Sequence, residues 1–369
     1  MEIIVYHVGG GDDDIGPTVA LIDKLKPYIK LVLFDARPGS TEVGVESIKT
    51  SSGVRAELVT VGVDEKTGSS DFFVNKFPLS SSLLPTSSQA GSENPNWVHC
   101  NTWAENTELD YIIKVPTDSI DSLVNSGKIP KPDFLSIDAQ GAEINILKGA
   151  SNALHDSILG LVTETEFFEI YKNQGLISDQ LNFLESFSIR LTEIYDQQNW
   201  YSTAPVGSGF LTVGETLFLK YAINPQGKDS SFKGCMNIAD LSVEKIKKMA
   251  LISYAFNRIS YSYFLLNFLK NNYLKDFLEL KMERPLKKLF YIYESIELGI
   301  NESKSKKNYF IKRRPEPLTY NRKVDTFLYY INFYTLYKAK RGVKFFFIFL
   351  SLVKNKKFHE LNKRIKNHL

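Results

Sequence analysis

The sequence predicts an α/β fold with a mostly parallel sheet, followed by an all-α module. Three observations support this. Short apolar runs alternate with helical patterns through the first part of the chain. The last two runs are joined by Tyr201 to Ser208, which is too short and too rich in turn residues for a crossover helix. Beyond about residue 241, long helical patterns rich in Phe, Tyr, Leu, Ile and Lys replace the strands.

The chain begins with a predicted βαβ unit. Apolar runs at residues 3–8 and 31–35 flank a helical stretch, Thr18 to Tyr28, whose Val19, Leu21, Ile22 and Leu25 fall on one face. Strands joined by such a helix are parallel. A third strand is expected at 56–63, and a fourth at 71–75 is expected to pair with it across the turn at Lys66-Thr67-Gly68.

The remaining elements continue this alternation. Residues 78–96 are rich in Ser, Pro, Thr, Gly and Asn and are expected to form a loop. A helix is expected from Gly175 to Phe187. Further strands are expected at 133–138, 158–164, 189–195 and 210–220. The last two strands would form an antiparallel hairpin, and a mostly parallel sheet closed in this way is usual in Rossmann-like class I methyltransferase domains.

Length and charge suggest two parts. At 369 residues the chain exceeds one typical domain, and we expect an α/β domain at 1–224, a linker at 225–240 and a basic, aromatic-rich helical module at 241–369. Residues 1–240 contain 17 Lys and Arg against 32 Asp and Glu, whereas the rest contains 28 against 10. The overall charge of +3 therefore hides an acidic first part and a basic second part.

The cysteines and apolar runs bear on location. Cys100 and Cys235 are too few for a disulfide framework and lack the spacing of a zinc site. No cluster of His, Cys and Asp has the spacing of metal ligands either, so we expect no metal. The N-terminus has no basic segment typical of a signal peptide. The longest apolar run, Val343 to Val353, is much shorter than a membrane span. We expect a cytoplasmic protein, or one peripheral to the inner face of the membrane.

The first predicted strand ends in a glycine loop that contains Gly9 and Gly11. Glycine there would let a ligand approach the backbone closely. The three aspartates at 12–14 disfavour a pyrophosphate at this place, and S-adenosylmethionine, with its sulfonium cation, suits acidic surroundings. Asp35, at the end of the second strand, is expected to accept the ribose hydroxyls. Asp64 would reach the adenine edge or serve in a turn.

The segment Pro132 to Glu143 combines a buried strand, a carboxylate, a glycine turn and a helix start. Asp138 ends this strand, where open α/β sheets hold their ligands. It is expected to contact the cofactor and to orient the acceptor or act as a base, with a structural helix N-cap as the alternative. Glu143 lies in the first helical turn, and we expect it to complement the helix dipole rather than to catalyse.

Two more groups are candidates for acceptor binding. Glu164 and Glu166 have strand spacing, so they share a face at the end of the next strand, where Glu164 would bind sugar hydroxyls. His99 is a candidate general base. Trp97 and Trp103 would either stack on a sugar ring or, in the favoured interpretation, belong to a buried aromatic cluster.

Read in order, four segments resemble the FkbM-type S-adenosylmethionine-dependent methyltransferases over roughly residues 1–222. They are Val63 to Gly68 with Phe72 to Val74, Val115 to Leu123, Phe134 to Gly149, and Leu161 to Tyr171 with Gly214 to Phe218. The family usually has an acid where this chain has His7 and where it has Gln140. The resemblance implies transfer of a methyl group from S-adenosylmethionine to a hydroxyl of a sugar or cell-surface polysaccharide precursor.

The sequence allows several binding partners for the basic C-terminal module. Its lysine clusters are interleaved with aromatics between Phe327 and Phe349. Such a module would form its own helical bundle, bind an anionic membrane surface or lipid-linked glycan, or, less favoured, bind nucleic acid. Two alternatives to the sugar methyltransferase stay open: a non-catalytic scaffold protein with the same fold, which His7 and Gln140 suggest, and an RNA methyltransferase that uses this module.

Overall fold

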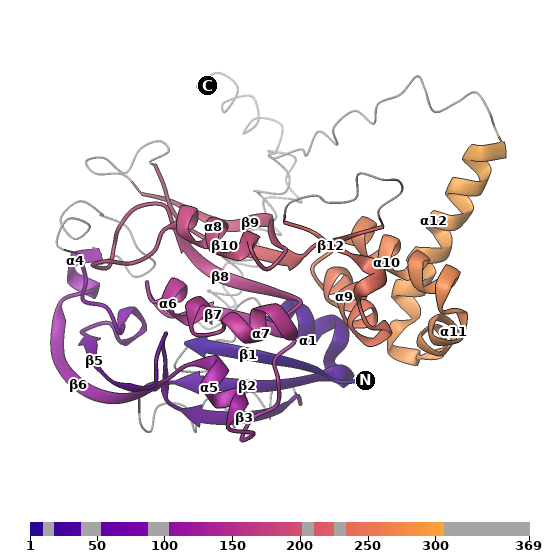
Figure 1. Ribbon diagram of the computed structural model, residues 1–369. Coiled ribbons are helices and arrows are strands. Elements are labelled where there is room, and N and C mark those ends of the chain that lie inside the picture. Colours follow the sequence, from indigo (N-terminus) through magenta and orange to yellow (C-terminus); the bar gives the residue numbers. More distant parts are fainter. Residues whose placement is uncertain (10–17, 38–52, 88–102, 201–209, 225–233, 306–369) are drawn as a thin grey trace, which may run out of the picture. The chain divides into compact units, whose positions relative to one another are not determined.

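The structure is a computed structural model that describes residues 1–9, 18–37, 53–87, 103–200, 210–224 and 234–305 (Figure 1). The chain divides into two compact units, Met1–Glu294 and Ser295–Leu369. Only the helix end up to Ser305 is described in the second unit. The sequence predictions for Asp12 to Asp14, for residues 88–96 of the expected loop and for residues 306–369 therefore lie outside the described residues.

A seven-stranded sheet forms the centre of the first unit, in the order β3-β2-β1-β7-β8-β10-β9. Its strands are β1 (Ile3–Gly9), β2 (Ile29–Asp35), β3 (Arg55–Thr60), β7 (Phe134–Asp138), β8 (Gly160–Glu166), β9 (Ile189–Trp200) and β10 (Phe210–Lys220). The first five in the order are parallel, and β10 is antiparallel to both β8 and β9. This confirms the predicted parallel sheet with a closing antiparallel hairpin.

Helices cover both faces of this sheet, because residues of a strand point alternately to either side. Ile3 and Val5 of β1 belong to a cluster with α1 (Val19–Leu25). Ile4 and Tyr6 belong to the opposite cluster, which contains α5 (Ile120–Asn125), α6 (Glu143–Lys148), α7 (Ser151–Asp156) and α8 (Ile177–Glu185). The result is a three-layer α/β/α arrangement with β1 buried in the middle.

A second, three-stranded sheet corrects one prediction. It contains β4 (Gly62–Val63), β5 (Gly68–Asn75) and β6 (Leu109–Asp118) in the order β4-β6-β5. The strand predicted at 71–75 therefore does not pair with the strand predicted at 56–63; β5 pairs with β6 in antiparallel register, and β3 joins β2 in the main sheet. The sequence did not indicate β6, because Pro116 interrupts it and its first residues are exposed.

Short elements complete the unit. They are η2 (Lys26–Tyr28), η3 (Pro78–Ser80), α4 (Trp103–Asn106), η4 (Ile238–Asp240), η5 (Arg284–Leu286) and the parallel pair β11 (Ala222–Ile223) and β12 (Met236–Asn237). Trp103 is buried and meets Tyr171 edge to face, with ring centroids 5.8 Å apart. For this tryptophan the favoured prediction of a buried aromatic cluster is confirmed.

The helices after residue 241 are α9 (Val243–Ala255), α10 (Ile259–Asn272), α11 (Leu274–Met282) and α12 (Lys287–Ser305). They confirm the helical character predicted for this region as far as residue 305, where the described residues end. Residues such as Ile246 and Leu265 share one hydrophobic cluster with β1 and α1, and Lys248 reaches the buried carboxylate of Asp133 at 2.9 Å. That residues 241–369 form an independent domain stays a prediction. Within the described ranges, no helix combines the length and apolarity that a membrane span needs.

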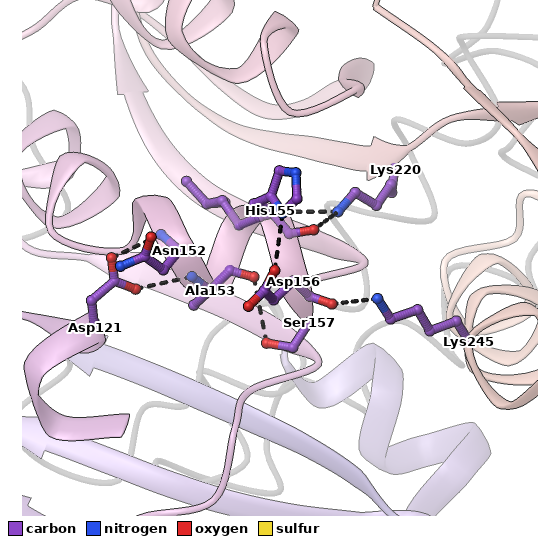
Figure 2. Close-up of polar contacts among 9 residues, drawn as sticks. Asp121, Asn152, Ala153, His155, Asp156, Ser157, Lys220 and Lys245 are labelled. Carbon is purple, nitrogen blue, oxygen red and sulfur yellow. Dashed lines mark hydrogen bonds and ion pairs between the residues drawn. The ribbon is translucent and has the colours of Figure 1, made fainter. Parts of the chain in front are cut away.

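Both ends of α7 are held by charged side chains (Figure 2). At its N-terminus the carboxylate of Asp121 accepts hydrogen bonds from the backbone N–H groups of Asn152 at 2.8 Å and Ala153 at 2.9 Å. At its C-terminus Lys220 Nζ donates to the carbonyl oxygens of Leu154 at 2.8 Å and His155 at 3.2 Å. A helix of six residues leaves most of its terminal backbone groups unpaired, so these contacts stabilise it.

The substitution Lys220→Met tests the C-terminal contact through its pH dependence. Burial lowers the pKa of Lys220 from 10.5 to about 8. Between these values the unfolded chain binds a proton that the folded chain does not, so the free energy of unfolding rises with pH. Relative to Lys220→Met, we expect the unaltered protein to gain up to about 1.4 kcal/mol per pH unit between pH 8 and 10, measured by urea denaturation.

The control is Lys131→Met, which removes an exposed lysine and alters the net charge equally. The difference in free energy of unfolding between the unaltered protein and Lys220→Met should grow with pH. If it stays constant across this pH window, the lowered pKa of Lys220 is contradicted.

Candidate active site

Four parallel strands end at one edge of the main sheet, and their last residues are polar or small. Gly9 ends β1, Asp35 ends β2, Asp138 ends β7, and Glu164 lies near the end of β8. The pairing registers place Gly9 opposite Asp138 and Ile137 opposite Thr163, so these ends are adjacent. Ligands of open α/β sheets bind at such an edge, beyond the carboxyl ends of the strands.

A cavity of about 250 Å³ lies at this edge. One group of lining residues is apolar: Val8, Phe34, Val61, Val63, Phe72, Leu79 and Leu83. The charged or amide-bearing lining residues are Asp35, Arg37, Asp138, Gln140 and Glu164. Asp35 and Asp138, the two carboxylates predicted from the sequence at different strand ends, therefore line the same pocket. Such a mixture of apolar surface and few polar groups is typical of sites for small ligands.

Gly9 occupies a position that no other residue could fill. Its φ is +91°, which L side chains rarely adopt, and a Cβ atom there would lie 1.6 Å from the carbonyl oxygen of Asp138. Gly9 also lines the pocket, as predicted for a residue of the glycine loop. Gly11 lies outside the described residues. The contact of either glycine with a cofactor stays a prediction.

Asp35 is almost buried, with 7% of its surface exposed, and its carboxylate has a partner that the sequence analysis missed. One oxygen accepts the backbone N–H of Arg37 at 2.7 Å, and the other lies 3.3 Å from the Arg37 guanidinium. Arg37 therefore orients the carboxylate and brings a positive charge to the pocket wall. The sequence could have indicated this contact, because Arg37 lies two residues after Asp35, and Asp side chains often accept the backbone N–H two residues further on.

The turn after Asp138 contains two residues in the left-handed region, Gln140 with φ +54° and Gly141 with φ +96°. The Gln140 amide nitrogen donates to Asp138 Oδ1 at 2.8 Å and to Glu164 Oε2 at 3.1 Å. Its Oε1 lies 2.8 Å from the hydroxyl of Tyr171. Gln140 therefore holds the two pocket carboxylates side by side, a role that the sequence analysis did not foresee.

Glu143 is fully buried, and its carboxylate supports the same turn. Its Oε1 accepts the backbone N–H of Ala139 at 2.9 Å and that of Gly141 at 3.2 Å. The sequence analysis expected Glu143 to complement the helix dipole, whereas the structure directs it at the preceding turn. Burial, together with the nearby negative charge of Asp138, raises the pKa of Glu143 to about 7.

Three glutamates form what we call the acidic cluster: Glu143, Glu164 and Glu166. One carboxylate oxygen from each lies within 4.8 Å of the others. Burial raises the pKa of both Glu164 and Glu166 well above the usual value, and the surrounding carboxylates raise it further. The strand spacing predicted that Glu164 and Glu166 share a face, and the cluster brings them together.

Besides Gly11, two predicted site residues are not part of the described pocket. Asp64 is absent from its lining, and its Oδ1 accepts the backbone N–H of Glu65 at 2.8 Å, as in the alternative turn role. His99 lies outside the described residues. The predicted roles of Asp64 at the adenine edge and of His99 as a base stay predictions.

Comparison with known proteins gives one family match and a short curated match. The family model described as Methyltransferase FkbM domain matches residues 10–191. The Hexuronic acid methyltransferase AglP of Haloferax volcanii is 42% identical over 72 residues. That match spans 19% of this chain and 29% of the length of the curated protein.

Two solved structures are similar at low sequence identity. Methyltransferase FkbM from Methylobacillus flagellatus is 14% identical, with a TM-score of 0.31, and the alignment covers 57% of this chain and 43% of that one. Precorrin-6y C5,15-methyltransferase from Geobacter metallireducens is 12% identical, also with a TM-score of 0.31, covering 59% and 80%. The family match makes residues 10–191 of this chain an FkbM methyltransferase domain.

Proposed function

We propose that this protein transfers a methyl group from S-adenosylmethionine to a hydroxyl of a sugar or polysaccharide precursor. The observation that carries the proposal is the shared pocket: Asp35 and Asp138 line one cavity at the carboxyl edge of the sheet. The family supports methyl transfer in general. A sugar acceptor is supported by the short match to a protein named for its action on hexuronic acid.

The lining residues fit the proposed donor. Asp35 would accept the ribose hydroxyls, and the apolar side chains of Phe34, Val61 and Phe72 would surround the adenine ring. Asp138 and Glu164 provide an acidic wall that suits a positive sulfur better than a phosphate. Because Arg37 pairs with Asp35, the negative charge of Asp35 is balanced, and the acidic wall consists of Asp138 and Glu164.

When bound, S-adenosylmethionine would supply a methyl group attached to positively charged sulfur. The acceptor oxygen would form the new C–O bond as the S–C bond breaks, leaving a neutral thioether. Asp138 would accept the hydroxyl proton, and Gln140 would fix its orientation. Because methyl transfer is an in-line displacement, holding oxygen and methyl in line would supply much of the catalysis.

The substitution Asp35→Asn tests the donor site. It removes a negative charge while keeping the side-chain size, and we expect the affinity for S-adenosylmethionine in calorimetry to fall about tenfold or more, about 1.4 kcal/mol. Asp110→Asn, at an exposed acid of β6, is the control and should bind like the unaltered protein. No binding by the unaltered protein would favour the scaffold alternative, and equal affinity in Asp35→Asn would refute the assignment of Asp35.

The substitution Asp138→Asn tests the proposed proton acceptor. An asparagine can still accept from Gln140 but takes up no proton, so kcat should fall by about 100-fold or more. Affinity for S-adenosylmethionine should change much less. The assay follows S-adenosylhomocysteine release and product mass with glycosides of hexuronic acids and of neutral hexoses; a nearly unchanged kcat would contradict the role.

The substitution Gln140→Gly tests the positioning of both carboxylates. Glycine accepts the positive φ and removes the side chain with its amide, so kcat should fall about tenfold, with little change in KM for S-adenosylmethionine. Gln140→Ala is the matched variant: it loses the same amide but keeps the Cβ atom that strains the backbone at positive φ, so it should unfold at a lower temperature than Gln140→Gly. If Gln140→Gly keeps full kcat, Gln140 does not position the site.

A further inference from the structure

The acidic cluster lies directly beside the pocket, because Glu164 belongs to both. Its members come from two elements: Glu143 begins α6, while Glu164 and Glu166 end β8. One oxygen from each lies within 4.8 Å of the others, about twice a Ca²⁺–oxygen bond length of roughly 2.4 Å. A single ion placed between them would therefore lie no more than about 2.8 Å from each of the three oxygens, and a small inward movement of the side chains would bring all three to bonding distance.

A second observation points to a ligand at this place. Glu166 has 0% of its surface exposed, and neither of its carboxylate oxygens has a hydrogen-bond partner among the described residues. The same is true of Oε2 of Glu143, which is equally buried. Burying a carboxylate oxygen that accepts no hydrogen bond is strongly unfavourable. A bound cation or hydrogen-bond donor between these three oxygens would remove that cost.

The charges around the cluster lead to the same conclusion. Asp138 and Glu215 add further negative charge to the surroundings of Glu164 and Glu166. In the part of the chain that the structure describes, no Lys, Arg or His forms an ion pair with a cluster glutamate. Arg37, a positively charged residue that lines the pocket, is paired with Asp35. The amide of Gln140 neutralises none of this charge.

We propose that Glu143, Glu164 and Glu166 bind one hard divalent cation, of the class of Mg²⁺, Mn²⁺ or Ca²⁺. A ligand set made only of carboxylate oxygens suits these ions and disfavours soft metals. Three protein ligands leave coordination positions for water or for substrate oxygens. Because Glu164 lines the pocket, the ion would face the acceptor side of the site.

The use of this ion rests on the proposed function. A cation that binds the acceptor hydroxyl favours loss of its proton, and it would hold two neighbouring sugar oxygens in a fixed orientation. The hydroxyl proton would still pass to Asp138, and the donor sulfur would still leave as a thioether. The ion would thus serve the acceptor, while Asp35 and the apolar wall would serve the donor.

Manganese binding by the full chain tests the site without donor or acceptor. After treatment with a chelator, the protein is titrated with MnCl₂ while the electron paramagnetic resonance signal of free Mn²⁺ is followed. We expect one ion per chain and a rise of several degrees in the unfolding temperature. Glu166→Gln should lose at least tenfold in affinity, whereas Glu169→Gln, an exposed glutamate of the same segment, should bind normally.

A further readout separates a metal ligand from a merely structural residue. In metal-free protein, Glu166→Gln should not lower the unfolding temperature, because no described residue forms a hydrogen bond with this carboxylate. In Mn²⁺-loaded protein, it should remove the rise that Mn²⁺ gives to the unaltered protein. If this variant does not fold, Glu164→Gln replaces it. Absence of Mn²⁺ binding, or equal binding by Glu166→Gln, would overturn the proposal. Since no methyl donor is present, either result leaves the proposed methyl transfer to its own tests.

Discussion

The close contact between Gly9 and the carbonyl oxygen of Asp138 is the constraint on which the site depends. The two strands end at the same level in parallel register, and the space that a side chain at Gly9 would occupy is filled by backbone. Because Gly9 carries no side chain, β7 can end beside β1 and turn sharply through Gln140 and Gly141. That turn sets the direction of the Gln140 amide. It also points two backbone N–H groups at the Glu143 carboxylate, which accepts a hydrogen bond from each.

The site concentrates negative charge that the fold alone does not require. Asp35 is balanced by Arg37, and Asp133, near the opposite end of β7, is balanced by Lys248. Glu166 has no such partner among the described residues. Buried charges without compensation are unfavourable for folding, so they are expected where a bound group makes up the difference. This contrast separates the carboxylates that serve structure from those that face the ligand.

Much of the fold and part of the site could be predicted from the sequence. Asp35 and Asp138 follow apolar runs, and parallel strands place their carboxyl ends at one edge, so local pattern was sufficient to bring them together. The role of Gln140 could not be predicted, because it depends on a positive φ and on a hydrogen bond to Glu164 on the next strand. The acidic cluster was missed for a similar reason: Glu143 joins it only after the turn reverses the chain. The strand β6 was hidden by Pro116, and the amphipathic pattern of α9 did not reveal that it packs against the sheet.

A crystal structure of the complex with S-adenosylhomocysteine tests the central claim most directly. The account predicts the ribose hydroxyls at the carboxylate of Asp35, the adenine among Phe34, Val61 and Phe72, and the sulfur on the side of Asp138. Density for the nucleoside at another place on the chain, or a ribose remote from Asp35, would contradict it.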